Sequence, residues 1–193
     1  AASRVELEPL ARLAAALPVP DKERKFGNLT LTYATQIHAC VIEIDQETGV
    51  TEVVDYAAVD DCGVRINPQI VEGQVMGATA HAIGAALWES FAYDEDGNLL
   101  TPNFYAYHVP HVLDMPPLRT GSFESPSPFT PLGAKGMGEG GGGGIHCICA
   151  AIQDALRAAG GGIVTDSHNP YHRVWELLSN PERSKGTVEV TSR

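Results

Sequence analysis

Apolar and β-branched residues fill two neighbouring stretches of this chain, which are separated by a turn sequence. The first stretch runs from Asn28 to Ile44, and the second runs from Val50 to Gly63. The residues DQETG between them have turn chemistry, with a glycine at the end. Two such runs across a short turn are typical of a β-hairpin. The pattern therefore predicts two paired strands within residues 28–63.

Three helices and one further strand are predicted after the hairpin. Asn67-Pro68 begins a segment rich in small residues, which favours a helix that can pack closely against a neighbour or a ligand. Residues 145–156 show apolar positions at helical spacing, and the glycines at 160–162 are expected to end that helix. The sequence NPYHRVWELL indicates a final helix with proline near its start, and LRTGSFESPSP indicates a strand. The proline-punctuated residues 101–117 are expected to be extended over a surface or an interface.

These elements predict an α+β fold, in which a mixed sheet with hairpin strands packs with helices. Residues 29–180 are expected to form the domain. Residues 1–28 form a peripheral segment with one short helix ended by prolines, and residues 181–193 form a polar tail.

The net charge of the chain disfavours some classes of binding partner. Of 193 residues, 44% are hydrophobic and 19% are charged, which is typical of a globular protein, and the formal net charge is -11. This charge argues against nucleic acid or an anionic membrane surface as a partner, because both are negatively charged. No apolar run approaches the length of a membrane span, about 18 residues. The start of the chain lacks a basic-then-apolar signal pattern, so a cytoplasmic location is expected.

The spacing of cysteine and histidine does not predict a metal site. The four cysteines include no C-x-x-C pair, and Cys147-x-Cys149 is a poor spacing for structural zinc. We expect these two cysteines to pack as small apolar residues in a helix. His108 and His111 straddle Pro110, which rules out a helical metal-binding pair.

Polar residues within the predicted elements have mostly structural explanations. His38 is expected to pack within the first strand or at its edge, and His81 is expected to be a satisfied core histidine. Asp60 and Asp61 end the second strand, where turn chemistry is a commoner explanation than metal binding. Gln74 differs, because a glutamine among glycines offers both a donor and an acceptor to a buried ligand.

The richest candidate chemistry lies in residues 131–154, PLGAKGMGEGGGGGIHCICAAIQD. Glycine removes the Cβ atoms, so backbone N–H groups can approach a bulky or anionic ligand. The helix that follows adds unpaired donors and a partial positive charge. Glu139 is the one acid of the loop, and partial exclusion of water would suit it to general-base catalysis. A flexible linker is the alternative, but the apolar Leu132 and Ile145 on either side favour a functional loop.

Three of these glycines also fit the dinucleotide fingerprint G-x-G-x-x-G, at Gly136, Gly138 and Gly141. That motif needs a buried strand directly before it. The preceding residues, SPSPFTPLGAK, are rich in proline, which disfavours a central parallel strand. A nucleotide-binding module is therefore a remote alternative.

Several motifs together resemble one known family. VDDCG-x-x-INP is followed by EGQ, IG-x-AL and YDEDG, and then by SPSP-x-x-PLG-x-KG-x-GE. In order and spacing these motifs are similar to those of the molybdenum hydroxylases, which include xanthine oxidase, aldehyde oxidoreductase and aerobic carbon monoxide dehydrogenase. The resemblance covers roughly residues 30–178 and falls at the C-terminal end of the molybdenum-binding subunit.

The resemblance implies roles for the matched positions. Glu139 takes the place of the family's active-site glutamate, which would accept a proton from a molybdenum-bound hydroxyl. The reaction would oxidise an aldehyde or an N-heterocycle with water as the oxygen source. The glutamine would lie beside the molybdenum ligands, and the glycines would let the backbone reach the pterin or its dinucleotide phosphate. The implied cofactor-binding residues are Gln74, Lys135, Gly136, Gly138 and Gly140.

Cofactors and partners are also implied by the resemblance. The cofactor would be molybdenum–molybdopterin as the cytosine dinucleotide, with no protein side chain as a metal ligand. Partner chains would carry [2Fe–2S] clusters and FAD, because this chain lacks the cysteine spacing of a cluster. The family's subunit is several times longer, so the chain is expected to be a split subunit or a fragment. Another chain would supply the rest of the molybdenum site, which acts on a small-molecule substrate.

Two departures from the family pattern leave other functions open. Relatives often carry Gln-Gly where this chain has His81-Ala82, and five successive glycines before His146-Cys147 are unusual. One alternative is a non-catalytic assembly or scaffold subunit of such a complex. Another is a subunit of the carbon monoxide dehydrogenase type, although that branch also needs a copper-binding cysteine loop that this chain does not show.

Overall fold

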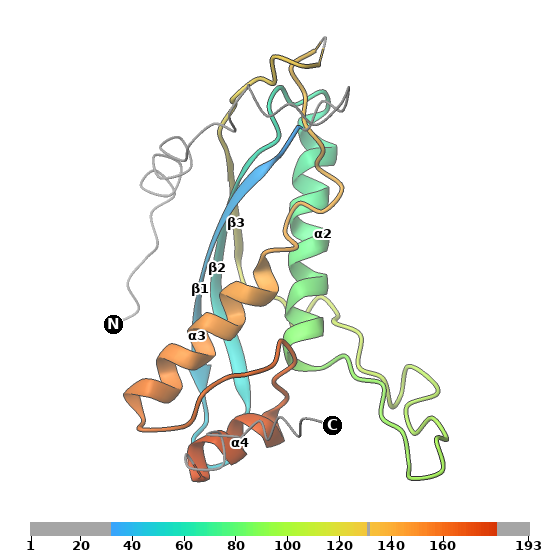
Figure 1. The fold of residues 1–193 in the computed structure, drawn as a ribbon, viewed down its shortest axis with the longest axis vertical. Helices are drawn as coiled ribbons and strands as arrows, with labels where there is room; N and C mark the ends of the chain where they lie inside the picture. Colours follow the sequence, from blue (N-terminus) through green and yellow to red (C-terminus); the bar gives the residue numbers. More distant parts are fainter. Residues whose placement is uncertain (1–31, 131, 181–193) are drawn as a thin grey trace, which may run out of the picture. The chain divides into compact units, whose positions relative to one another are not determined.

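The fold combines a three-stranded sheet with helices, as the computed structural model shows for residues 32–130 and 132–180 (Figure 1). This confirms the predicted α+β class. The predicted peripheral segment 1–28 and polar tail 181–193 lie outside the described residues, and the boundaries of the predicted domain remain predictions. The elements are β1 (Thr35–Ile44), β2 (Thr51–Asp61), α2 (Pro68–Leu87), β3 (Leu118–Ser122), α3 (Gly144–Ala158) and α4 (Tyr171–Ser179).

The predicted hairpin is confirmed, because β1 and β2 are neighbours in the sheet and are joined by a short turn. The N–H of Asp45 donates to the carbonyl of Val50 (2.9 Å), and the N–H of Gly49 donates to the carbonyl of Asp45 (2.7 Å). Gly49 has φ 77°, a left-handed conformation that glycine adopts without a steric cost. The Asp45 carboxylate accepts N–H groups within the turn, which explains why DQETG turns the chain here.

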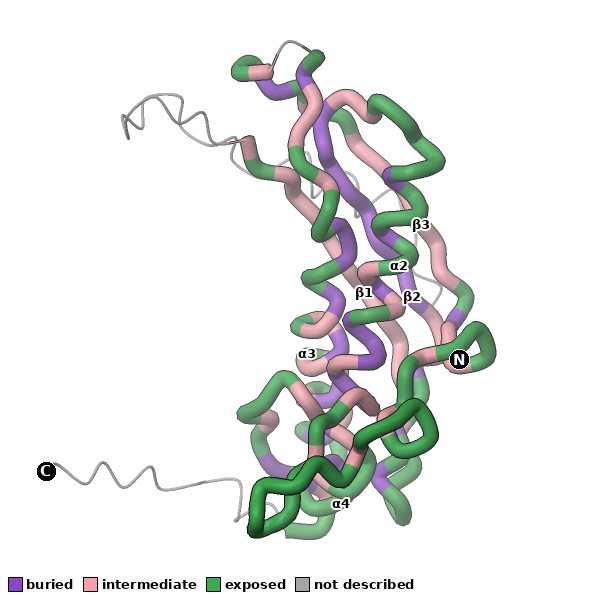
Figure 2. The backbone as a smooth tube through the Cα atoms, turned by 90° about the vertical axis from the view of Figure 1, so that its right-hand side faces the viewer, coloured by how far each residue is buried: buried purple, intermediate pink, exposed green. Residues whose placement is uncertain are grey.

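The third strand makes the sheet mixed. β3 pairs in parallel with β2, in a register that runs from Tyr56 opposite Leu118 to Asp60 opposite Ser122. Parallel neighbours need a long crossover connection, and α2 with the segment after it provides one. β2 is the central strand, and its residues 56–61, with the two that follow, are buried without interruption, as the purple tube in Figure 2 shows. The strand predicted from LRTGSFESPSP is confirmed over its first five residues.

The described residues form two compact units. The first contains residues up to 39, 55–82 and 116–144, and the second contains 40–54, 83–115 and 145–180. In the first unit, α2 buries Val71, Val75, Thr79 and Ala82, at the spacing of one helix face. The candidate functional site lies in this unit.

The core of the second unit is built on α3 and α4. α3 buries Ile148, Ile152 and Leu156, which lie four residues apart, and confirms the helix predicted from that spacing. Gly160 has φ 74°, and the N–H of Gly161 donates to the carbonyl of Leu156 (2.7 Å), which is the expected glycine end of the helix. The final predicted helix is also confirmed as α4, which directly follows Pro170.

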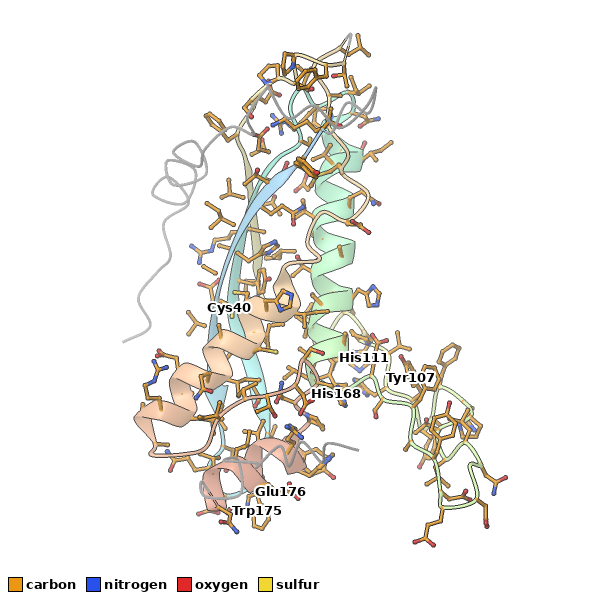
Figure 3. The ribbon with its side chains drawn as sticks, in the orientation of Figure 1. Cys40, Tyr107, His111, His168, Trp175 and Glu176 are labelled. Atoms are coloured by element: carbon orange, nitrogen blue, oxygen red, sulfur yellow. The ribbon has the colours of Figure 1, made fainter. Side chains whose placement is uncertain are left out.

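The segment between α2 and β3 differs from its prediction. The residues YDEDGNLL form a turn, because Tyr93 and Leu99 pair in an antiparallel bridge. The following residues are not extended throughout, since Tyr107 N–H donates to Asn103 and the chain turns again at residues 111–114. The Asn103 side chain accepts two backbone N–H groups and favours this turn. Figure 3 labels Tyr107 and His111 on this segment. None of the helices in the described residues is both long and apolar enough to cross a bilayer.

Candidate functional site

The glycine-rich loop and the residues at the start of β1 and just before it line an open hollow of about 560 Å³ in the first unit. Ligand sites in proteins typically have volumes of about 300–1,000 Å³, so this hollow has room for a small ligand or part of a large cofactor. The predicted site residues Glu139, Gly136, Gly138 and Gly140 come together here. The remaining lining residues are Thr32, Tyr33, Ala34 and Gln36.

Glu139 lies at the hollow with its side chain exposed. In this chain, therefore, the expected partial exclusion of water is not present at the carboxylate. Within residues 32–130 and 132–180, no hydrogen bond or ion pair to the carboxylate restrains it. The backbone around it is turned, since the N–H of Gly142 donates to the carbonyl of Glu139 (2.9 Å). The position of the acid is consequently set by the backbone of the loop.

Two glutamine side chains anchor the loop, one on each side of Glu139. The amide nitrogen Nε2 of Gln74, on α2, donates to the carbonyl of Gly138 (2.8 Å). After the acid, the N–H of Gly141 donates to Oε1 of Gln36, on β1 (2.9 Å). Gln74 was predicted from the sequence, and the structure brings it to the loop. Gln36 was not predicted, although a glutamine two residues from a histidine within a predicted strand was a visible signal.

The glycines of the loop divide into two groups. A Cβ at Gly136 or Gly138 would meet no atom of the described residues within 4 Å, so their backbone is open to a ligand. At Gly140 a Cβ would collide with the side chain of Met137. Gly141 has φ 103°, and a Cβ there would lie 2.7 Å from the backbone nitrogen of Thr79. Gly141 therefore serves packing against α2, a distinction that composition did not reveal, whereas Met137 can move away from a side chain at Gly140, whose cofactor contact remains a prediction.

Lys135 directs its ammonium group into the protein. Its Nζ lies 3.1 Å from Oδ2 of Asp61 and donates to Oγ of Ser125 (2.7 Å), and its backbone N–H donates to the carbonyl of Cys62. The side chains of Lys135 and Asp61 are 12% and 7% exposed. In this arrangement the lysine fastens the start of the loop to the end of β2.

Asp61 is the centre of that attachment. Its Oδ1 accepts the N–H groups of Gly63 (2.8 Å) and Ser125 (3.0 Å), so the predicted turn chemistry is confirmed. Burial alone would raise the pKa of Asp61, but hydrogen bonds from Ser125, Gly63 and Lys135 outweigh it and leave this pKa below its ordinary value. The carboxylate is therefore charged in the folded protein and pairs with the lysine.

The two histidines of the first unit differ in their surroundings. His38 is half-buried and bonds to Gln36 and Tyr56, which confirms that it packs within the strand. Burial lowers the pKa of His38, so its ring is neutral at pH 7. His81 is exposed, so its interpretation as a core histidine is wrong. The helix position explains this, because His81 lies outside the buried stripe that contains Thr79 and Ala82.

The cysteines of α3 pack in the second unit, as predicted. Cys147 and Cys149 are half-buried, and the Sγ atom of Cys147 lies 3.5 Å from that of Cys40, which Figure 3 labels on β1. Cys149 contacts the backbone carbonyl of Ser167. Across the described part of the chain, no group of three or more His, Cys, Asp or Glu side chains is arranged to hold a metal ion.

The site therefore combines a hollow of ligand size, bare glycine backbone beside it and one acid whose position is set by the loop backbone, an arrangement suited to ligand binding and acid–base chemistry. A family model described as molybdopterin cofactor-binding domain matches residues 3–116. The chain belongs to the molybdopterin cofactor-binding domain family. The resemblance to the molybdenum hydroxylases, which the sequence motifs carried, is thereby confirmed.

Individual relatives agree with this family. The carbon monoxide dehydrogenase large chain of Afipia carboxidovorans is 37% identical over 148 residues, which are 76% of this chain and 18% of that protein. The nicotine 6-hydroxylase large subunit of Paenarthrobacter nicotinovorans is 39% identical over 158 residues, or 79% of this chain and 18% of that protein. The crystal structure of quinoline 2-oxidoreductase from Pseudomonas putida 86 gives a TM-score of 0.70 at 39% identity, covering 75% of this chain and 18% of that one. The chain thus spans about a fifth of the length of these relatives, at 18% of each.

Proposed function

We propose that this chain supplies the glutamate-bearing part of the active site of a molybdenum hydroxylase. The observation that carries the proposal is the position of Glu139 in the lining of the hollow, between the open backbone of Gly138 and the anchored backbone of Gly141. A carboxylate in such a place can accept a proton from a nucleophile bound in the hollow.

The residues present fit a bulky anionic cofactor. The open Cβ positions of Gly136 and Gly138 form a cradle that any larger side chain would occupy, and the hollow has the volume of a ligand site. When bound, molybdenum–molybdopterin supplies the two-electron redox chemistry that amino acids lack. We propose that it binds as the cytosine dinucleotide, with the backbone of these two glycines against it.

Each side chain then has a separate task. Glu139 accepts the proton of a water-derived nucleophile at its carboxylate and later releases it to solvent, which reaches its exposed side chain. Gln74 holds the loop through Gly138 and so lies next to the cofactor cradle. Lys135 acts indirectly, because its ammonium group is committed to Asp61 and Ser125. We keep it as a residue that shapes the cofactor site by fixing the start of the loop.

The substrate is proposed to be an aldehyde or an N-heterocycle, oxidised with water as the oxygen source. Similarity to nicotine 6-hydroxylase and quinoline 2-oxidoreductase favours the heterocycle. Similarity to carbon monoxide dehydrogenase supports carbon monoxide oxidation as the second candidate. Dye reduction by the purified complex, with each of the three substrate classes in turn, distinguishes these candidates.

The rest of the enzyme is proposed to come from other polypeptide segments. A second chain or segment would complete the walls around the cofactor, which the exposed Glu139 leaves open. Partner chains would carry [2Fe–2S] clusters and FAD to remove the electrons, and the complex would work in the cytoplasm. Analysis of the polypeptides, molybdenum, iron and flavin that purify with this chain tests all of these points together.

The decisive experiment replaces Glu139 by glutamine in the assembled enzyme. The shape of the side chain is kept and its basicity is removed, so kcat/KM should fall by about 10²- to 10⁴-fold with molybdenum and pterin contents unchanged. Glu176→Gln is the matched control, because it removes the same charge from an exposed position on α4 (Figure 3). Full turnover by Glu139→Gln would contradict the proposal. Cofactor-free wild-type complex would instead support a non-catalytic scaffold subunit.

A further inference from the structure

The hydrogen bonds that begin at Gly141 continue through three side chains of the first unit. The N–H of Gly141 donates to Oε1 of Gln36 (2.9 Å), and the same Oε1 lies 3.2 Å from Nε2 of His38. The other ring nitrogen of His38, Nδ1, lies 3.0 Å from the hydroxyl of Tyr56. Gln36 and His38 are two residues apart on β1 and therefore face the same side of the strand. Tyr56 is on β2 and is completely buried.

The backbone amide at the end of this chain of bonds fixes the direction of every other bond in it. An amide N–H can only donate, so the Gln36 atom that faces Gly141 must be the carbonyl oxygen. That oxygen accepts, so Nε2 of His38 must carry the ring proton. Nδ1 is then an acceptor, and the Tyr56 hydroxyl donates to it. A neutral ring is required for this order, and burial lowers the pKa of His38 in the direction that keeps the ring neutral.

The loop also packs tightly against the same side chains. A Cβ placed at Gly144 would lie 2.6 Å from the Tyr56 hydroxyl, and one placed at Gly143 would lie 3.2 Å from the His38 ring. A larger residue at Gly144 would force the Tyr56 side chain to shift, and one at Gly143 would make a tight contact with the His38 ring. Two interactions therefore hold the loop: the close contacts of Gly143 and Gly144 with His38 and Tyr56, and the hydrogen bond from Gly141 to Gln36.

We propose that Gln36, His38 and Tyr56 are positioning residues, which hold the Glu139 loop in place beside the hollow. The proposal rests on the proposed function of Glu139. Glu139 is two residues before Gly141 and is tied to the same turn through Gly142. The Glu139 carboxylate has no restraining partner among the described residues, so the backbone of the loop must determine where the carboxylate lies. A displaced Gly141 would carry the acid away from the reacting group.

Two variants of the assembled enzyme test the proposal. Gln36→Leu removes the acceptor for Gly141 at nearly constant volume. Tyr56→Phe removes one oxygen at the far end of the network. The matched control is Gln153→Leu, because Oε1 of Gln153 accepts the N–H of Val164 (2.9 Å) in the second unit and is likewise half-buried.

The first readout is amide hydrogen exchange in the loop, which does not depend on turnover or on the cofactor. Gln36→Leu should speed exchange in the peptide that covers residues 139–144 by about tenfold, as expected for the loss of one hydrogen bond. Tyr56→Phe should speed it by a smaller factor. Gln153→Leu should speed exchange around Val164 only.

The second readout is the division of the kinetic effect between kcat and KM. Gln36→Leu should lower kcat by about 10- to 100-fold, because a misplacement of about 1 Å can cost about 100-fold in rate. KM should change by less than about threefold, since binding does not depend on the exact position of the base. Gln153→Leu should leave both constants near the wild-type values.

The outcomes separate this inference from the proposed function. If Glu139→Gln is inactive while Gln36→Leu keeps wild-type kcat and loop exchange, the positioning role is refuted and the base is not. If Glu139→Gln is fully active, the proposed function fails, and a positioning role for catalysis fails with it. Should Gln36→Leu not fold, Tyr56→Phe decides alone, because wild-type exchange and kcat in that variant overturn the proposal.

Discussion

Replacing Gly141 by alanine should destabilise the protein by about 3 kcal/mol, whereas the same change at Gly138 should not. Gly141 has φ 103°, where a side chain costs roughly 1–2 kcal/mol or more. Its Cβ would lie 2.7 Å from the backbone nitrogen of Thr79 and the carbonyl oxygen of Val75. Both atoms belong to the backbone of α2 and cannot rotate away, so overpacking adds about 1–3 kcal/mol. The restriction of the unfolded chain by alanine offsets about 0.4–1 kcal/mol of this loss.

Gly138 is the internal control for that estimate. It lies three residues earlier in the same loop, its φ is not positive, and no described atom lies within 4 Å of an added Cβ. Alanine there should therefore change the free energy of unfolding by less than about 1 kcal/mol, in the stabilising direction. The same Cβ would occupy the cradle proposed for the cofactor, so Gly138→Ala should lower the molybdenum and pterin content instead.

Urea unfolding followed by circular dichroism measures the first effect, and metal analysis measures the second. A lower midpoint at an unchanged m-value in Gly141→Ala would indicate lost stability with no change in the unfolded state. Equal midpoints for the two variants would refute the reasoning, because the packing of the loop on α2 would then have no energetic consequence. Full cofactor content in Gly138→Ala would refute the cradle.

Two further predictions concern an ion pair and a thiol pair. Asp61→Asn leaves the Lys135 ammonium buried without its counter-ion, so it should lower the free energy of unfolding by about 3 kcal/mol at pH 7. The pKa of Asp61 is depressed in the fold, so the stabilisation by its charge is complete above the unfolded pKa, about 3.9, and is lost as the pH falls below it. The difference in unfolding free energy between Asp61→Asn and the wild type should therefore shrink when urea titrations are repeated towards pH 3. Diamide should join Cys40 and Cys147 in a disulfide, with diamide reduced to its hydrazine, because their sulfur atoms are 3.5 Å apart. Their hydrogen bond and burial raise the pKa of Cys40, so the reaction should be slow at pH 7 and faster at higher pH, as peptide mass spectrometry can follow.

Each of these predictions has a contrary result. A pH-independent difference between Asp61→Asn and the wild type would show that the charge of Asp61 does not stabilise the fold. A diamide product that forms equally well in Cys40→Ser would show that Cys147 reacts with another thiol. Retention of both free thiols at high pH would show that the side chains cannot reach bonding geometry.

The sequence predicted most of the fold where local chemistry determines structure. The Asp45 turn and the apolar spacing of α3 are local signals, and both elements formed where they were expected. The parallel pairing of β3 with β2 was not predicted, because register between distant strands leaves no mark in either segment. The turns in residues 101–117 were missed because the prolines suggested extension, while the Asn103 side chain stabilises a turn.

The chemical groups of the candidate site could be predicted from the sequence, but the contacts that hold the loop could not. Glu139 and Gln74 could be chosen because an acid among glycines and a glutamine among small residues are unusual. Gln36 was not considered and His38 was interpreted, correctly, as a packed residue, but their shared face of the strand was not used to link them to the loop. Lys135 was named from the family resemblance alone, and the fold directs its ammonium group to Asp61, a partner 74 residues away in the chain. Long-range partners of this kind are invisible to spacing rules.

The five-glycine run now has a physical explanation that a flexible linker does not provide. A flexible loop could not aim an unrestrained carboxylate, because general-base catalysis requires hydrogen-bond reach to the proton that is removed. In this chain Gly141 fits against α2 and donates to Gln36, and Gly144 lies against Tyr56, so the missing side chains create contact rather than freedom. Glycine at these positions rigidifies the loop, and glycine at 136 and 138 leaves it open to a ligand. Because the two effects belong to different residues of one short segment, stability and cofactor content should respond to different substitutions.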